Sequence, residues 1–274
     1  MDILVTPDWL AKELGSPDLV VLEATKYLPN EGKDGHETFL KAHIPGARYF
    51  DLDVIADIDS DLPHMVPSAG RFARLVAALG VSDNSRVVFY DQNATMWATR
   101  GWWMMGLFGH DQVAVLDGGL AAWQASGRPT ESGEPPAAKP GHFTPQLRAT
   151  RLRGLGDMLT TDALVLDARG AARFAGRSPE PRPGVSPGHI PGAVNLPYTN
   201  LVGPDGTFLP PDALRQRLAA VGADARPVVT SCGSGVSATM IAFALARAGL
   251  PQGAVYDGSW AEWGASPTTP KETS

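Results

Sequence analysis

The chain has 274 residues, of which 43% are hydrophobic and 19% are charged, and its formal net charge is −6. This length suits two domains of ordinary size, and the acidic balance argues against nucleic acid as a partner. No apolar run reaches the roughly 20 residues of a membrane helix, and the N-terminus lacks the features of a signal peptide. The single cysteine cannot form an internal disulfide, so we expect a cytoplasmic protein without a membrane partner. The six histidines lack ligand spacing, so no metal is expected.

Strands and helices alternate along the first half. Thr6 followed by Pro7 predicts the start of a helix, because threonine is a good cap and proline suits the first helical position. Apolar and β-branched runs predict the strands, and longer periodic segments predict the helices. The further expected elements are a strand at 19–23, a helix at 68–79, a strand at 87–90, a helix at 95–105 and a strand at 113–116.

The composition changes in the middle of the chain. Between 125 and 150 the prolines are Pro129, Pro135, Pro136, Pro140 and Pro145, and they lie among Gly, Ser and Glu. Repeated prolines exclude a helix or a central strand, so this segment is predicted to be an extended linker. We therefore expect an N-terminal domain at 1–124 and a C-terminal domain at 151–274.

The second half repeats the first in the same order. The matching features are a strand at 163–167, a His-Ile-Pro-Gly-Ala block at 189–193 that repeats 43–47, a strand at 227–230, a helix at 239–249, and an Asp-Gly-x-x-x-x-Trp end at 257–263 that repeats 117–123. Alternating strands and helices predict an α/β fold. We expect two tandem domains, each a mostly parallel sheet flanked by helices on both faces.

The only cysteine, Cys232, lies in a tight loop between a predicted strand and the helix at 239–249. Gly233 and Gly235 allow this loop to curl, so that backbone N–H groups and the helix N-terminus can hold a negative charge beside the sulfur. This setting predicts a nucleophilic thiolate. The alternative is a small buried hydrophobic residue.

The duplication provides an internal comparison. Asp91 occupies the position in the first half that Cys232 occupies in the second. A carboxylate cannot act as a soft nucleophile, so the second half is predicted to be catalytic and the first is not.

Both halves carry the two repeated blocks, and in this they resemble the rhodanese-type sulfurtransferases over nearly the whole chain. The loop Cys-Gly-Ser-Gly-Val-Ser-Ala at 232–238 resembles the 3-mercaptopyruvate branch, whose loop reads Cys-Gly-Ser/Thr-Gly-Val-Thr. The thiosulfate branch typically has Arg and Lys after the cysteine, where this chain has Gly233 and Ser234. Ser237 departs from the usual threonine but keeps a hydroxyl.

The resemblance implies a transferase that takes sulfur from 3-mercaptopyruvate as a Cys232 persulfide and releases pyruvate. The acceptor it implies is a thiol such as thioredoxin, or cyanide in an assay, and no dissociable cofactor is implied. The substrate-binding residues it implies are Arg173, Arg182, Gly233, Gly235, Val236 and Ser237. Guanidinium groups grip carboxylates through paired hydrogen bonds, although these two arginines could instead form structural ion pairs.

The resemblance also implies a proton relay of Ser234, His64 and Asp53, in which the first half contributes to catalysis. A histidine in a proline-rich loop could instead be merely solvated, and Ser234 could only order the loop. His43 and His189 recur in both halves, including the half without a nucleophile, which indicates a structural role. Trp102, Trp103, Trp260 and Trp263 are most simply explained by packing.

Three other functions remain alternatives at this point. A thiosulfate sulfurtransferase would share the fold and the persulfide. A binding module that senses anions or carries sulfur without turnover is the alternative outside enzymes. A phosphatase of the same fold family would need an arginine at the position of Ala238, so it is disfavoured.

Overall fold

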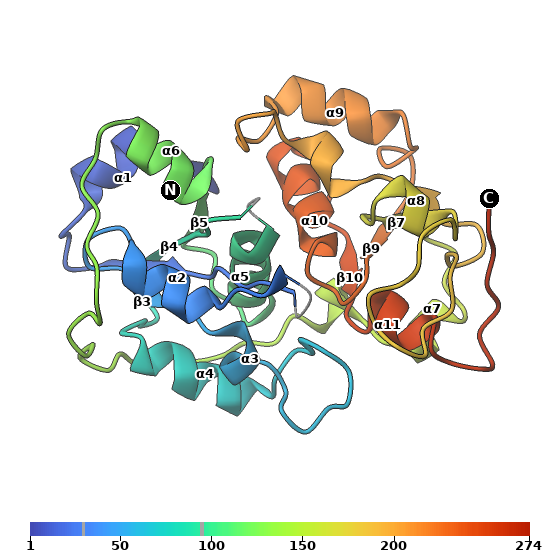
Figure 1. Ribbon diagram of the computed structural model, residues 1–274, viewed down its shortest axis with the longest axis horizontal. Helices are drawn as coiled ribbons and strands as arrows, with labels where there is room; N and C mark the ends of the chain where they lie inside the picture. The colour runs from blue at the N-terminus through green and yellow to red at the C-terminus, as the bar shows by residue number, and fades with distance from the viewer. Residues whose placement is uncertain (29–30, 94–95) are drawn as a thin grey trace. The chain divides into compact units, whose positions relative to one another are not determined.

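The computed structural model describes residues 1–28, 31–93 and 96–274. It divides into two compact units. The first unit comprises Met1–Ile58, Val66–Arg148 and Pro204–Thr207; the second comprises Asp59–Met65, Ala149–Gly203 and Phe208–Ser274. In Figure 1 the first unit runs mainly from blue to green and the second mainly from yellow-green to red.

The first unit is built on a five-stranded parallel sheet in the order β1-β5-β4-β2-β3. Its strands are β1 (Leu4–Val5), β2 (Leu19–Glu23), β3 (Arg48–Tyr49), β4 (Arg86–Tyr90) and β5 (Val113–Leu116). Its helices are α1 (Pro7–Glu13), α2 (Gly35–Lys41), α3 (Leu52–Ile55), α4 (Ala69–Ala78), α5 (Met96–Leu107) and α6 (Gly119–Ala125).

The second unit repeats this sheet in the order β6-β10-β9-β7-β8, again with all strands parallel. Its strands are β6 (Leu152–Arg153), β7 (Leu164–Asp167), β8 (Val194–Asn195), β9 (Val228–Ser231) and β10 (Ala254–Tyr256). Its helices are α7 (Leu155–Met158), α8 (Ala171–Phe174), α9 (Pro211–Ala219), α10 (Ala238–Arg247) and α11 (Ser259–Trp263), with 3-10 turns at Ala149–Arg151 and Tyr198–Leu201. The predicted fold, two α/β domains with parallel sheets and flanking helices, is confirmed.

The strands and helices that the sequence predicted are present in the structure. Thr6 caps α1 by accepting a hydrogen bond from the backbone N–H of Trp9, and Pro7 is the first helical residue. The expected helix at 95–105 corresponds to α5, although Thr95 lies outside the described residues. The sequence did not reveal β1, β3, β6 or β8, because strands of two residues are too short to show a period. It also did not predict β10 or several helices, among them α2 and α9.

Alternation along β4 distributes its side chains between two layers of helices. Val88 and Tyr90 belong to one buried cluster, which also contains Leu10 of α1, Phe39 of α2 and Trp123 of α6. Phe89 points the other way, toward α5, where a Cβ atom on Gly101 would lie 2.3 Å from the Phe89 ring. In this unit the sheet is therefore covered on both faces.

The proline-rich segment after α6 is ordered against the first unit. Glu131 and His43 exchange two backbone hydrogen bonds, and the N–H of Gly133 donates to the Leu40 carbonyl. The units defined by contacts thus place residues up to Arg148 with the first domain. The boundaries at 124 and 151 remain a prediction.

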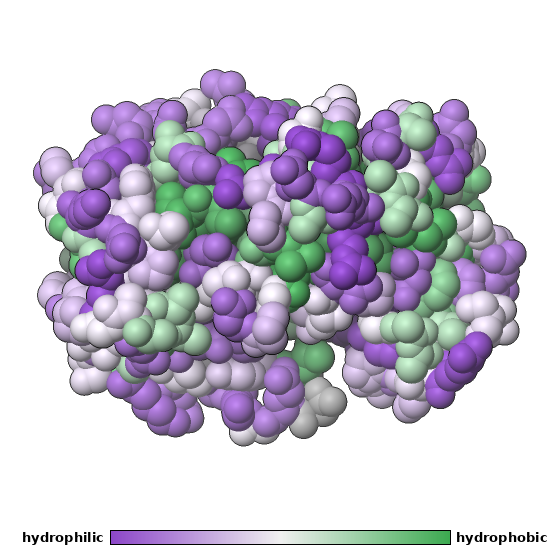
Figure 2. Space-filling model, turned by 90° about the horizontal axis from the view of Figure 1, so that it is seen from above, coloured by the Kyte–Doolittle hydropathy of each residue, from purple (hydrophilic) through white to green (hydrophobic). Residues whose placement is uncertain are grey.

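The surface is mainly polar. Hydrophilic residues predominate on the face drawn in Figure 2, interrupted by smaller apolar groups. Within the described ranges, no helix combines the length and the apolar character needed to cross a bilayer.

The first unit buries a carboxyl group at the end of β2. Glu23 is fully buried, and its Oε1 accepts from the backbone N–H and the hydroxyl of Thr25, whereas Oε2 has no hydrogen-bond partner among the described residues. Burial raises the pKa of Glu23 to about 8, and the Asp91 carboxylate adds to this while Thr25 opposes it. The folded chain therefore holds a proton that the unfolded chain loses near pH 4.5.

We expect Glu23→Gln to be more stable than the wild type at about pH 8, by a few kcal/mol, and nearly equal to it at about pH 5. Below pH 4.5 Glu23 is protonated in both the folded and the unfolded chain, so it does not lower the stability of the wild type. As the pH rises from there toward 8, the carboxyl group ionises readily only in the unfolded chain, and the wild type loses stability that the glutamine variant keeps. Denaturant unfolding at several pH values measures the difference. Glu37→Gln, at an exposed site on α2, should show no such pH dependence. A constant difference for Glu23→Gln across this range would contradict the prediction.

Candidate active site

Cys232 follows the last residue of β9 and is 2% exposed. Six residues later α10 begins at Ala238. This places the cysteine at the carboxyl end of a parallel strand, next to a helix N-terminus, where ligands of α/β proteins commonly bind. The sulfur thus lies at the carboxyl edge of the sheet, where the nearby helix N-terminus favours an anionic substrate.

Ser259 holds the cysteine loop in place from the neighbouring strand and helix. Its Oγ accepts from the backbone N–H groups of Cys232 and Gly235, both at 3.1 Å, and donates to the Tyr256 carbonyl at 2.7 Å. Ser259 is fully buried and has a φ of +48°, a conformation that favours glycine. At the matching place in the first unit, Gly119 has a φ of +57°. Only the half with the cysteine has a serine in this strained position, where its hydroxyl fixes the loop.

We expect Ser259→Ala to destabilise the chain by about 2 kcal/mol, because it leaves two buried N–H groups without an acceptor and keeps the strained φ. Ser259→Gly should lose about 1 kcal/mol less, because glycine adopts the positive φ without strain. Denaturant unfolding of the three chains measures this order. Equal stability of Ser259→Ala and the wild type would contradict the positioning role.

The remaining N–H groups of the loop are available to a ligand. The backbone N–H groups of Gly233, Ser234, Val236 and Ser237 donate to no residue in the described part of the chain. Gly235 was also predicted to bind substrate, but its N–H is bonded to Ser259 and its φ is +73°. Gly235 therefore shapes the loop, and the other N–H groups are the ones that can meet an anion.

Two arginines lie against the cysteine loop. A Cβ atom on Gly233 would lie 3.1 Å from Nη2 of Arg173 and 3.9 Å from Nη1 of Arg182. Glu180 pairs with Arg173, with Oε2 and Nη2 2.5 Å apart, and this carboxylate is almost fully buried. Arg173 is thus partly neutralised by its own partner.

Arg182 differs from Arg173 in having no carboxylate paired with it in the described part of the chain. It is half-buried and forms no ion pair with the residues the structure describes. Burial lowers the pKa of its guanidinium, and Arg173 does the same, whereas Cys232 and Glu180 act in the opposite direction. A half-buried cation without an ion-pair partner favours an incoming carboxylate.

Arg169 holds the base of this cluster. It is bonded to Asp167, to Glu180 at 2.9 Å and to the carbonyl of Gly188, and it is almost fully buried. Its guanidinium also lies 4.6 Å from the centre of the Trp260 ring. With all these contacts, Arg169 fixes Glu180, which in turn orients Arg173.

His64 contacts the serine of the cysteine loop. Its segment, Asp59–Met65, belongs to the second unit, and its Nδ1 lies 3.1 Å from Oγ of Ser234. His64 has a φ of +61°, which is uncommon for a residue with a side chain. Asp53, the third predicted member of the relay, lies on α3 of the first unit and forms an ion pair with Lys26. Its part in the relay remains a prediction.

In the first unit a carboxylate takes the place of the cysteine. Oδ2 of Asp91 accepts from the N–H groups of Trp97 and Ala98, each at 3.0 Å, and Oδ1 accepts from Asn93 at 3.2 Å. Asp91 therefore caps α5 with a negative charge. The loop of the first half contains its own anion, and it has no nucleophile at this position.

The two repeated histidines have the same contacts in each half. Nδ1 of His43 donates to the Phe39 carbonyl at 2.9 Å, and Nδ1 of His189 donates to the Phe174 carbonyl at 2.8 Å. Each ring also stacks on that phenylalanine. The shared geometry supports the structural interpretation. The tryptophans Trp102, Trp103, Trp260 and Trp263 are all buried. No group of three potential metal-ligating side chains is present among the described residues.

Comparison with known proteins identifies the family. The model of the rhodanese-like domain matches residues 6–126 and again 153–266, and the chain belongs to this family. A 3-mercaptopyruvate sulfurtransferase of Rattus norvegicus is 41% identical over 271 residues, covering 95% of this chain and 91% of the relative. The enzyme of the same name from Escherichia coli strain K12 is 37% identical and covers 98% and 97%.

A further relative and a solved structure match nearly the whole of this chain. A "Thiosulfate/3-mercaptopyruvate sulfurtransferase 1, mitochondrial" from Arabidopsis thaliana is 37% identical over 98% of this chain and 78% of the relative. The crystal structure of the 3-mercaptopyruvate sulfurtransferase SseA from Escherichia coli superposes with a TM-score of 0.85 at 34% identity, covering 95% of this chain and 99% of that chain.

Two residues of the site were not found from the sequence. Ser259 lies in the repeated Asp-Gly-x-x-x-x-Trp block, and a serine opposite Gly119 was the available signal. Glu180 lies between the two predicted arginines, but no periodicity indicates that its carboxylate turns back to Arg173.

Proposed function

We propose that this chain is a 3-mercaptopyruvate sulfurtransferase that works through a Cys232 persulfide. The observation that carries the proposal is the placement of Cys232 in a loop with unengaged N–H groups, beside Arg173 and Arg182. The names of its relatives support the same donor.

The reaction begins with an attack by the Cys232 thiolate on the sulfur of 3-mercaptopyruvate. A sulfur–sulfur bond forms, the carbon–sulfur bond breaks, and its electron pair leaves with pyruvate as the enolate. The N–H groups of Gly233, Ser234, Val236 and Ser237 stabilise the charge on the transferred sulfur. Arg182 binds the substrate carboxylate, with Arg173 beside it, because a guanidinium fork matches a carboxylate.

Two protons must be managed in this step. The substrate thiol loses one, and the enolate carbon gains one to become pyruvate. The contact between His64 and Ser234, at 3.1 Å, supports their role in moving the thiol proton. Asp53 is the third proposed member of this relay.

The persulfide then gives its outer sulfur to a thiol, and we propose a reduced protein such as thioredoxin as acceptor. The thiolate of the acceptor attacks the outer sulfur, and Cys232 leaves as the thiolate. We propose the cytoplasm as the compartment, because the lone cysteine must stay reduced between turnovers.

The ratio of kcat/KM for 3-mercaptopyruvate to that for thiosulfate, with cyanide as common acceptor, tests the proposal. We expect a ratio well above one, together with a mass increase of one sulfur atom on Cys232 when the donor is added alone. A preference for thiosulfate would instead favour a thiosulfate sulfurtransferase, because the two arginines can also attract the thiosulfate dianion. Persulfide formation without turnover would instead indicate a sulfur carrier.

A further inference from the structure

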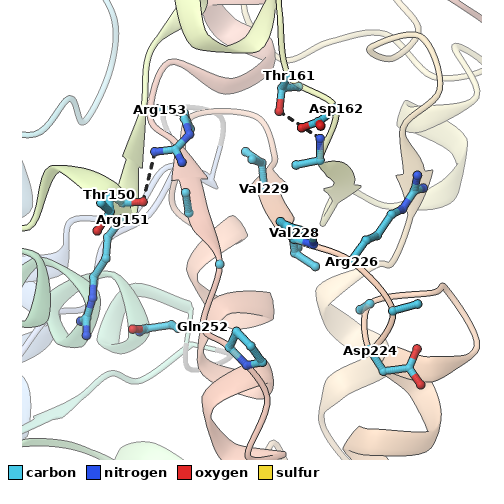
Figure 3. Close-up of a pocket in the computed structure, with 17 residues that line it drawn as sticks. Thr150, Arg151, Arg153, Thr161, Asp162, Asp224, Arg226, Val228, Val229 and Gln252 are labelled. Carbon is cyan, nitrogen blue, oxygen red and sulfur yellow. Dashed lines mark hydrogen bonds between the residues drawn. The ribbon is translucent and has the colours of Figure 1, made fainter.

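The second unit has a cavity of about 730 Å³ at the edge of its sheet opposite to the cysteine. Its walls are the loop before β9, the loop before β10, and residues beside the starts of β6 and β7. Figure 3 shows Arg151 and Arg153 on one side of this cavity and Asp224 and Arg226 on the other. We call this cavity the β9–β10 groove. Its lining includes none of the residues of the cysteine site.

The matching edge of the first unit is covered by the chain itself. Residues 138–148 cross the loops before β4 and β5, in an extended course without helix or strand. The N–H of Gly141 donates to the Ala77 carbonyl, and those of Gln146 and Arg148 donate to the carbonyls of Phe108 and Leu107. Thr144 donates its N–H and its hydroxyl to Asp83. These bonds are mostly made by backbone, so the surface accepts an extended polypeptide.

Matched glycines show that the groove lacks this cover. Gly80 follows α4, and a Cβ atom there would lie 3.5 Å from Ala138; on Gly109, after α5, it would lie 2.8 Å from Gln146. Their counterparts are Gly222 after α9 and Gly249 after α10, which also have positive φ. A Cβ atom on Gly222 would meet nothing within 4 Å, and on Gly249 only Arg215, at 3.8 Å. Both glycines lie beside the groove rather than in its lining, and the Ala248 carbonyl, which matches that of Phe108, accepts from Arg215 instead. This edge of the second unit therefore has no covering chain in the described residues, and Arg215 occupies part of it.

The charges of the groove indicate what kind of chain would fit. In the first unit Arg86, at the start of β4, is held by Asp18 and Glu13. In the groove Arg226 is exposed and has no ion pair with described residues, and Arg153 donates only to the carbonyls of Thr150 and Leu152. The groove is lined by three arginines, the third being Arg151, and by two acids, Asp162 and Asp224, so it has an excess of one positive charge.

We propose that the β9–β10 groove docks an extended, carboxylate-bearing segment of a partner protein, in the manner that residues 138–148 cover the first unit. The carboxylates would face Arg153 and Arg226, and N–H groups would face Asp224. Because β9 separates the groove from Cys232, a docked segment would leave the thiol accessible. The groove would thus bring a partner protein to the catalytic domain without blocking its reaction.

The test uses two fluorescein-labelled synthetic peptides with the sequence of residues 138–148. One is unchanged, and the other carries Lys139→Glu and Arg148→Glu. Fluorescence polarisation with the full chain should show binding of the acidic peptide, at least about tenfold tighter than that of the unchanged peptide. Arg226→Glu should weaken the acidic peptide about tenfold and reverse the preference.

Controls separate the groove from a general charge effect. Arg217→Glu changes the same charge at an exposed site of α9 outside the groove and should leave binding unchanged. Arg226→Glu should keep the sulfur-transfer rate, which shows that it is folded; Arg226→Gln serves if it is not. No binding of the acidic peptide, equal effects of the Arg226 and Arg217 variants, or full displacement by millimolar inorganic phosphate would overturn the proposal, the last indicating a site for small anions.

Discussion

Cys232→Ser should lose sulfur transfer by at least about a thousandfold while remaining folded, because a hydroxyl of similar size cannot form the persulfide. The residue is buried, and its contacts with Oγ of Ser259 and with the N–H of Trp260 are made by the backbone of residue 232, so a serine would be held equally well. Thiocyanate formation from 3-mercaptopyruvate and cyanide measures the loss, and thermal unfolding checks the fold.

A matched variant separates the nucleophile from its surroundings. Ser234→Ala removes the hydroxyl that lies 3.1 Å from His64 but leaves the sulfur. It should still form the persulfide when the donor is added, at a reduced rate. Substantial turnover by Cys232→Ser would refute covalent catalysis at this residue, since the chain has no second cysteine to replace it.

Arg182→Ala should lower kcat/KM for 3-mercaptopyruvate about 10- to 100-fold, the usual effect of removing a hydrogen bond to a charged group. The loss should be smaller for thiosulfate, which has no carboxylate to be gripped. The kcat/KM of Arg182→Lys for 3-mercaptopyruvate should lie between those of the wild type and Arg182→Ala, because lysine keeps the charge but lacks the paired donors of the guanidinium group. Steady-state kinetics with both donors, using cyanide as acceptor, give these values.

The same segment provides the control. Arg177 is exposed, and its side chain donates to the carbonyl of Ser274, so Arg177→Ala should leave both donors unaffected. Equal losses of Arg182→Ala with both donors would show a general electrostatic role and would refute carboxylate recognition. If Arg182→Ala is active and its donor ratio is the same as that of the wild type, well above one, the branch assignment survives while the role of Arg182 does not.

The parts of this protein that sequence predicts well are local or repeated. The strand before Cys232, the glycines after it and the helix that follows are all close neighbours in the chain, and each has its own signal. The second copy of the pattern then fixes the number of domains and shows, through Asp91, which half can carry the nucleophile.

The parts that sequence misses depend on contacts between distant residues. Nothing local indicates that Ser259 accepts hydrogen bonds from two N–H groups of a loop more than twenty residues earlier. The pairing of Glu180 with Arg173, which distinguishes the two arginines, needs the turn between them. The prolines near 125–150 correctly indicate extended chain, but they do not show that it lies along the first unit.

The fixed carboxylate of Asp91 has a thermodynamic consequence for the duplicated architecture. In the first half the charge that caps α5 is covalently part of the chain, so the stability of that half does not depend on its chemical history. In the mechanism proposed above, the matching charge of the second half belongs to a sulfur that is loaded and unloaded in each turnover. By linkage, any species that binds the folded loop more strongly also stabilises that unit. On this mechanism one copy has a constant stability, while the stability of the other depends on whether its cysteine carries the extra sulfur.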